Sequence, residues 1–166
     1  MKPRDRVIQE EDATRITQIL TRFLGDSGAG EALLIDRGGQ LLAMDGGGSR
    51  TLDTVSISAL AAAAFSSTAA MAQLLGETEF TMLFHEGAKW SIHVSTVDKE
   101  AILLAVFDER TTVGMVRVFA KEASRAVGAV LGEVRARPRP AGEFAAPLNA
   151  AESGPAWTPP PWTPPY

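Results

Sequence analysis

Between Thr54 and Gly76 the chain contains no charged residue, and this run restricts its fold more than any other feature. Wound as a helix at 3.6 residues per turn, the run places most of its larger side chains on one side. That side is typical of a stripe that faces a hydrophobic core. The stripe consists of Ile57, Leu60, Ala64, Met71 and Leu75.

The opposite side of this predicted helix is small and uncharged, where a helix facing water would normally carry lysine and glutamate. Its residues are Val55, Ala59, Ala62, Ser66, Ala70 and Gln73. Small residues four positions apart let another backbone approach closely, so this side predicts a docking surface for protein. The alternative is a central helix that is buried on both sides within one domain.

The uncharged run is close to the length that spans a membrane. However, it contains several hydroxyl side chains and a glutamine, and most of the remainder is alanine, so we expect no membrane span. No apolar stretch with a basic flank opens the chain, and we expect no signal peptide. The absence of cysteine excludes disulfides and thiolate chemistry. A cytoplasmic protein is the simplest interpretation.

Size and charge narrow the classes of partner. A chain of 166 residues with 45% hydrophobic residues can bury one core. The formal net charge is −4 and the basic residues do not cluster strongly, so nucleic acid is not an expected partner. The densest basic group is Arg135, Arg137 and Arg139. We interpret it as a solvated helix end, where cations complement the negative end of the helix dipole.

Periodicity and turn residues predict the element order α-β-β-α-β-β-β-α. The predicted elements are a helix at about 9–24, strands at 31–36 and 40–44, the uncharged helix capped by Asp53, strands at 80–85, 90–97 and 101–107, and a helix at about 112–135. The fold class is α/β (α+β), a sandwich with a five-stranded antiparallel sheet. We expect the first and last helices on one sheet face and the uncharged helix on the other. The chain divides into an arm (1–8), this domain (9–137) and a tail (138–166).

The tail holds most of the prolines and gives the unit Trp-Thr-Pro-Pro twice. Such a segment cannot form a core and prefers extended polyproline II geometry. Trp157 and Trp162 belong to the residue type that is most favoured at binding hot spots. Two interpretations therefore remain open, a disordered end and a segment that binds an unknown partner.

Motifs for catalysis and for cofactors are missing from the sequence. The glycines at 46–48 lack the Lys-Ser/Thr of a phosphate-binding loop, and there is no Gly-x-Ser-x-Gly elbow. His85 and His93 lie on neighbouring predicted strands, but no cysteine or helical His-x-x-x-His accompanies them. We therefore expect no metal site, no cofactor and no enzymatic activity, and we interpret His93 as a strand residue that faces a helix.

Five sequence motifs carry a resemblance to a known family. The hairpin Leu33–Ala43 and the element order resemble the roadblock (dynein light chain) family. Four further motifs are similar to the MglB branch of that family, the bacterial polarity proteins that partner the Ras-like GTPase MglA. These motifs are Leu52-Asp53, Leu74–Glu77, Phe84–Ala88 and Val106–Arg117. The similarity covers roughly residues 10–135.

The resemblance implies a homodimer whose sheets join edge to edge and whose central helices form a platform for one small Ras-like GTPase (MglA type). It implies stimulation of GTP hydrolysis, a role in cell polarity and motility, and a cytoplasmic protein enriched at a cell pole. Carried onto this chain, the GTPase-binding platform is Ala59, Ala62, Ser66, Ala70 and Gln73. The tail departs from the acidic or helical extension of such relatives, so no family role is carried onto it.

A second functional class stays open, a roadblock scaffold that binds a GTPase or a signalling complex without stimulating hydrolysis. Regulators of the MglB type reorder the GTPase's own catalytic residues and insert no arginine finger. The arginines that could complete a GTPase site are Arg37, Arg50, Arg110 and Arg117. The sequence assigns none of them to a phosphate, and Arg37 and Arg110 are interpreted as solvated turn residues.

Overall fold

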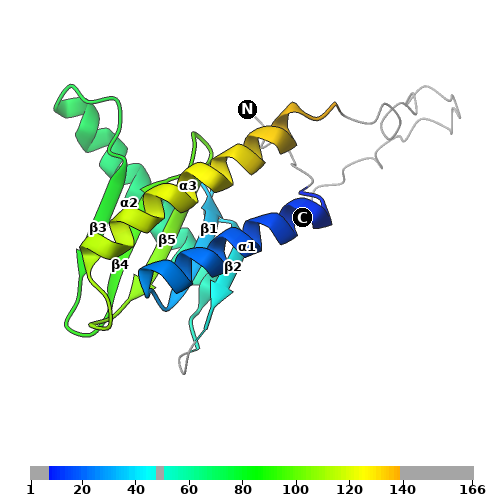
Figure 1. Cartoon of the computed structure of the whole chain (residues 1–166). Helices are drawn as coiled ribbons and strands as arrows, with labels where there is room; N and C mark the ends of the chain where they lie inside the picture. Colours follow the sequence, from blue (N-terminus) through cyan, green and yellow to red (C-terminus); the bar gives the residue numbers. More distant parts are fainter. Residues whose placement is uncertain (1–7, 48–50, 139–166) are drawn as a thin grey trace, which may run out of the picture.

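The computed structural model describes residues 8–47 and 51–138, and its helices and strands follow the predicted order. The helices are α1 (Glu10–Ser27), α2 (Thr54–Leu74) and α3 (Val113–Ala136). The strands are β1 (Glu31–Asp36), β2 (Leu41–Gly46), β3 (Met82–Glu86), β4 (Ser91–Thr96) and β5 (Ala101–Phe107). Figure 1 shows α1 and α3 side by side across the sheet, with α2 behind it.

The strands form one antiparallel sheet in the order β2-β1-β5-β4-β3. β5 occupies the centre, and every one of its residues is buried. This burial explains its continuous apolar sequence, because a strand covered on both faces has no solvent side. Within the described residues, β2 and β3 each pair on one side only, so they form the two edges of the sheet.

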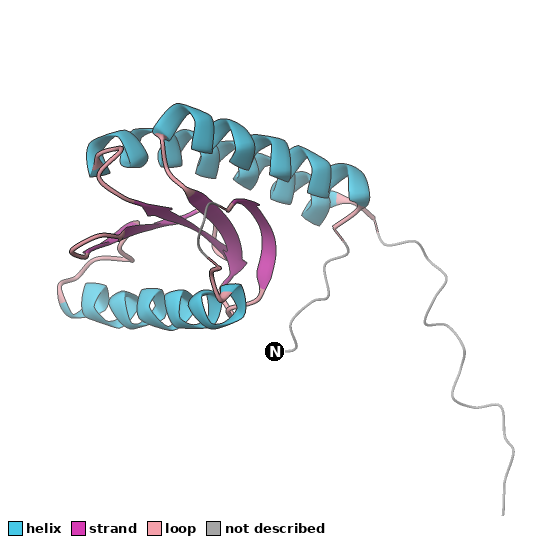
Figure 2. Cartoon of the chain, turned by 90° about the horizontal axis from the view of Figure 1, so that it is seen from below, coloured by secondary structure: helices cyan, strands magenta, loops and turns pink. Residues whose placement is uncertain are grey.

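Figure 2 shows helices on both sides of the sheet, and a hydrophobic core lies between the sheet and the helices on each side. Alternate residues of β1 divide between them, with Leu34 facing α1 and α3 and Leu33 facing α2. The predicted alternation of β4 is also confirmed, since Val94 packs in the α2 core while Ser95 reaches Ser124 of α3. The prediction that two helices cover one face and the uncharged helix covers the other is therefore correct.

The described arginines at the end of α3 are exposed, as predicted for a solvated helix end, and they also pair with acidic residues of other elements. The Arg137 guanidinium donates to the buried Asp12 carboxylate (Nη2 to Oδ1, 2.9 Å). This hydrogen bond holds the pKa of Asp12 below its usual range. Arg135 forms ion pairs with Asp98 and Glu100. Arg139 lies outside the described residues.

By length and composition alone, α2 is a helix that could cross a membrane. In the structure it forms one layer of the domain, and its Ala61, Ala62 and Phe65 pack against the sheet. A single helix of this length and composition is weak evidence of a membrane span, and 33% of its apolar window is buried inside the domain.

Candidate docking surface

The candidate site is the solvent side of α2, a helix whose first turn is capped by Asp53. The Asp53 carboxylate accepts hydrogen bonds from the Ser56 hydroxyl (2.6 Å) and the Ser56 amide (3.0 Å). The bond from the amide satisfies one of the free N–H groups of the first turn, as predicted for a helix cap. Both bonds also hold the pKa of Asp53 below its usual range, the hydroxyl contributing most.

The buried side of α2 differs from the predicted one. Its residues recur every three or four positions and centre on the aromatic side chain of Phe65. They are Ser58, Ala61, Ala62, Phe65, Thr68 and Ala72. Leu60 and Met71, which were predicted to face the core, are 69% and 51% exposed. The predicted faces are thus rotated by about a quarter turn around the helix axis.

The side opposite Phe65 is the outer face of α2, and it alternates small residues with large hydrophobic ones. It consists of Ser56, Leu60, Ala63, Ser67, Met71 and Leu74, all of them exposed. The Ser67 hydroxyl donates to the Ala63 carbonyl (3.0 Å), so this polar group is already satisfied within the helix. The face therefore presents mainly carbon to solvent, which is typical of a protein interaction site.

The predicted platform residues lie mostly beside this outer face. Ala59, Ser66, Ala70 and Gln73 are exposed. Ala62 is only 4% exposed and packs against the sheet, so it is not available for docking and its place in the platform is a wrong prediction. Ala63 and Ser67 are not among the predicted platform residues, and Leu60 and Met71 are predicted to face the core. The position of Phe65, the one aromatic residue of the run, was the signal that could have set the faces correctly.

The end of α2 extends the apolar surface beyond the sheet. Figure 1 shows this end projecting past the strands, beside the segment that leads into β3. Leu74 and Leu75 are 88% and 73% exposed there. β3 is an edge strand, so its outer backbone groups are available for pairing with another strand. An apolar helix end and an open strand edge thus occur at the same end of the sheet.

The turn between β1 and β2 packs against the start of α2. Gly39 has φ +90°, and a Cβ atom there would lie 2.9 Å from the Ala59 Cα, so glycine is required on both grounds. Arg37 is three-quarters buried in its side chain, and its guanidinium lies over the Phe65 ring. The interpretation of Arg37 as a solvated turn residue is therefore wrong.

The two histidines lie on opposite faces of the sheet. His93 faces Phe84 across the β3–β4 ladder, while His85 faces Ile92, and successive strand residues point to opposite sides. His93 is buried, and its burial, with the nearby Arg117 charge, lowers its pKa from 6.5 to about 4. Among the described residues, no group of three or more His, Asp or Glu side chains could hold a metal ion.

The remaining candidate residues follow β5, lie on α3 or are outside the described residues. Arg110 follows β5 and pairs with Asp108 (Nε to Oδ1, 2.8 Å). Arg117 lies on α3, which covers the other sheet face. Arg50, Trp157 and Trp162 lie outside the described residues.

Residues 15–107 match the model of the Roadblock/LC7 domain. No curated protein sequence matches the chain. The structure of the gliding protein MglB from Thermus thermophilus is similar, with a TM-score of 0.75 and 31% identity over 80% of this chain and 99% of that one.

Two further MglB structures are similar to this chain. Myxococcus xanthus MglB has a TM-score of 0.71 and 34% identity, over 77% of this chain and 96% of that one. An MglB with a tetrameric arrangement has a TM-score of 0.76 and 30% identity, over 81% and 99%. The match to the domain model and the three similar structures show that the chain belongs to the Roadblock/LC7 domain family and has a structure like that of MglB.

Proposed function

We propose that this protein is a homodimeric regulator that stimulates GTP hydrolysis by a Ras-like small GTPase of the MglA type. The observation that carries the proposal is the uncharged, exposed outer face of α2 in a chain of MglB-like structure. Leu60, Met71 and Leu74 would remain in water in an isolated domain. Covering them with protein removes apolar area from water, which is the main favourable term in association.

Homodimerisation through β3 and the end of α2 would cover part of this surface. Antiparallel pairing of two β3 strands would satisfy both open edges and produce one continuous sheet. The same twofold relation would bring the two projecting α2 ends together, so that Leu74 and Leu75 are buried. Self-association of this chain is supported by the similar MglB structure, which has a tetrameric arrangement.

The paired α2 helices would then offer one broad surface for a GTPase. Ala59, Ala63, Ser66 and Ala70 bring little side-chain volume, so a partner can approach the helix backbone closely. The regulator would act by reordering catalytic groups that the GTPase itself carries. The Thermus relative is named a gliding protein, which supports a role in motility and polarity for this chain.

GTP hydrolysis by an MglA-type GTPase from the same organism, measured under single-turnover conditions with increasing amounts of this protein, tests the proposal. We expect a saturable increase in rate that a variant carrying Ala63→Arg does not give. Tight binding without any increase in rate would replace this function by that of a roadblock scaffold. Absence of both binding and stimulation would contradict the proposal.

A further inference from the structure

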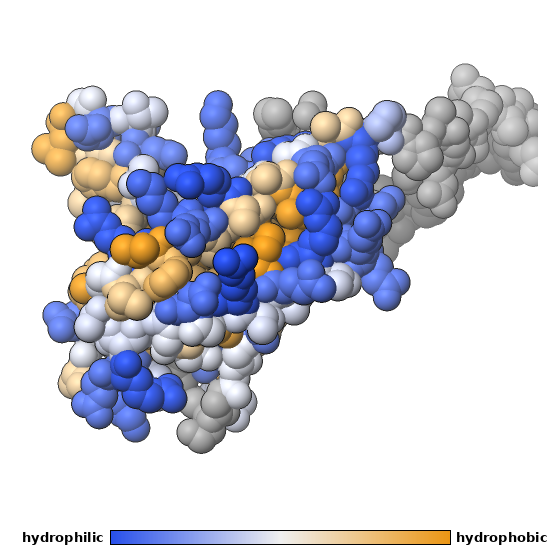
Figure 3. Space-filling view, viewed as in Figure 1, coloured by the Kyte–Doolittle hydropathy of each residue, from blue (hydrophilic) through white to orange (hydrophobic). Residues whose placement is uncertain are grey.

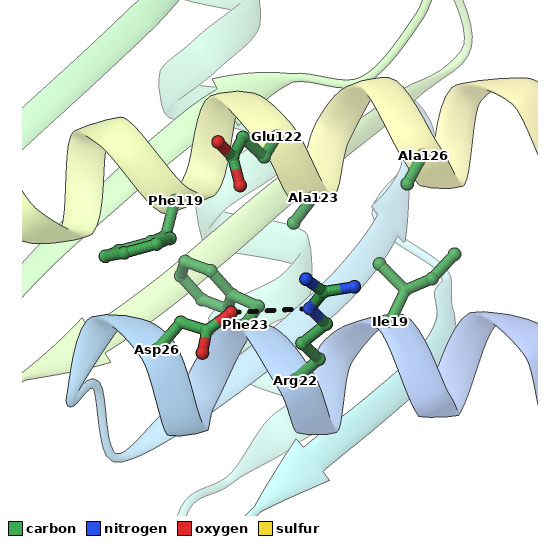
Figure 4. A pocket seen from close by; sticks show the side chains of 8 residues that line it. All are labelled: Ile19, Arg22, Phe23, Asp26, Phe119, Glu122, Ala123 and Ala126. Carbon is green, nitrogen blue, oxygen red and sulfur yellow. Dashed lines mark ion pairs between the residues drawn. The ribbon is translucent and has the colours of Figure 1, made fainter.

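On the side of the sheet away from α2, a groove runs between α1 and α3. Figure 4 shows its walls, with Ile19 and Phe23 on α1 facing Phe119, Ala123 and Ala126 on α3. The groove holds a half-open pocket of about 170 Å³, in which Phe23 and Ala123 are nearly buried and form the floor. The charged residues of its lining stand at the rim, where Arg22 and Asp26 form an ion pair (3.5 Å) and Glu122 extends from α3. The floor is therefore apolar and the rim is polar.

Exposed hydrophobic residues continue the apolar floor along α3. Met115 lies one turn before Phe119 on the same side of the helix and is 46% exposed, and Val118 beside it is 57% exposed. Figure 3 shows hydrophobic residues gathered in a band along this side of the molecule, bordered by hydrophilic ones. Because α2 lies on the other face of the sheet, the proposed dimer and GTPase contacts leave this band uncovered.

The chain itself supplies a segment of matching chemistry. The segment Trp157–Tyr166 contains two tryptophans, a tyrosine and prolines, and it carries no charged side chain. Flat aromatic rings and proline rings bury large apolar area at a small cost in side-chain entropy. The aromatic rings of the segment match the apolar pocket, and its proline rings match the apolar band beside the pocket.

The length of the connecting chain permits this contact. Phe119 lies about 26 Å back along α3 from Ala136, at a rise of 1.5 Å per residue. From the end of α3 to Trp157 the chain could span roughly 60 Å at about 3 Å per residue. A tethered segment also has an effective concentration in about the millimolar range, which favours it over a separate partner.

We propose that the segment Trp157–Tyr166 docks in the α1/α3 groove of its own chain, with a tryptophan ring in the pocket lined by Phe23 and Phe119. The tail is then an internal ligand that covers part of the apolar band. The proposal is independent of the function proposed for α2, because the two surfaces lie on opposite sheet faces.

Fluorescence of the full chain tests the contact. In a Trp90→Phe background the only tryptophans are Trp157 and Trp162. We expect emission at shorter wavelength than that of water-exposed indole, and acrylamide quenching about twofold weaker than in the same chain with Ala126→Arg, because a docked ring is buried. Ala13→Arg, at an exposed position of α1 outside the pocket lining, is the matched control and should resemble the parent. Equal quenching in the parent and Ala126→Arg chains would overturn the proposal.

Disulfide trapping keeps Trp90 and distinguishes docking within one chain from docking between chains. The sequence has no cysteine, so Ala126→Cys and Pro160→Cys introduce the only thiols. Under mild oxidation we expect an intrachain disulfide, seen as a faster-migrating monomer on non-reducing gels, and far less of it when Ala13→Cys replaces Ala126→Cys. Covalent dimers alone, or equal yields from the two pairs, would contradict docking of the tail on its own chain.

Discussion

The guanidinium carbon of Arg37 lies 5.0 Å from the centre of the Phe65 ring, and this contact joins the β1–β2 turn to α2. The same guanidinium donates to the Asp98 carbonyl (3.3 Å) and forms an ion pair with Glu79 (3.5 Å). One turn residue thus connects α2, the β4–β5 turn and the segment before β3. The position of α2 over the sheet depends in part on this arginine.

Arg37→Ala should therefore lower the free energy of unfolding by about 1–2 kcal/mol, through the lost stacking on Phe65 and the lost packing of its alkyl stem. Urea denaturation followed by circular dichroism measures the change. Arg22→Ala is the control, because the Arg22 side chain is 84% exposed and its ion pair with Asp26 should contribute less than about 0.5 kcal/mol. Equal costs for the two variants would contradict the linking role of Arg37.

A second prediction concerns the faces of α2. Phe65→Ala should cost about 3–5 kcal/mol, because the ring is almost completely buried and its removal leaves a cavity. Leu60→Ala should change the unfolding free energy of the monomer by less than about 0.5 kcal/mol, since its side chain is mostly exposed. Denaturation at protein concentrations low enough to exclude self-association separates these effects. A large cost for Leu60→Ala in the monomer would instead favour the faces that periodicity predicts.

The buried faces of the strands could be predicted from the sequence, whereas the buried face of α2 could not. Hydrophobic alternation in β4 and the continuous apolar run of β5 determine their faces, because strand side chains point to opposite sides in turn. In α2 almost every position is small or apolar, so periodicity selects no single face. Only the sheet beneath it, with Leu33 and Ile35 around Phe65, determines which alanines are buried.

Long-range ion pairs were not predictable for a different reason. Arg137 meets Asp12 only because α1 and α3 lie side by side, although the two residues are far apart in the chain. The sequence shows both charges but not the distance between them. The groove between Phe23 and Phe119 could not be predicted for the same reason. Each phenylalanine belongs to a different helix, and the sequence does not show that the two helices lie side by side.

Acid should destabilise the protein through His93. The pKa of its imidazole is about 4 in the folded protein and 6.5 in the unfolded chain, so between these values the unfolded chain binds more protons than the folded one. The His93 penalty is absent above pH 6.5, grows as pH falls through that value, and reaches about 3 kcal/mol near pH 4. Urea denaturation from pH 7.5 to 4 measures it.

His93→Leu is the comparison for this pH dependence. Both ring nitrogens of His93 are buried without a hydrogen-bond partner in the described part of the chain, so an apolar replacement of similar size removes no bond. The variant should lose less stability than the parent between pH 6.5 and 4. Parallel pH profiles would show that His93 does not titrate as described, since carboxylates such as Asp12 contribute equally to both proteins.

Substitution of the outer face of α2 should abolish GTPase binding without unfolding the domain. Ala63→Arg adds a long charged side chain at an exposed position of this face, where no core cavity or overpacking results. Ser66→Arg and Ala70→Arg, at exposed positions beside this face, should have the same effect. Circular dichroism checks the fold, and titration of the GTP-bound GTPase measures binding, with Ala13→Arg as the control. Normal binding by all three variants would place the GTPase elsewhere.

The final prediction is that no arginine of this chain acts as a finger in the GTPase site. An arginine finger supplies roughly 10³–10⁵-fold in rate, so its removal is readily detected. Arg110 is paired with Asp108, Arg117 lies on the sheet face opposite α2, and Arg37 is engaged with Phe65. Each arginine-to-alanine variant at these positions and at Arg50 should therefore retain most of the stimulated rate at saturation. A loss of about a hundredfold or more in one folded, binding-competent variant would identify that residue as the finger and overturn the proposed reordering of the GTPase's own groups.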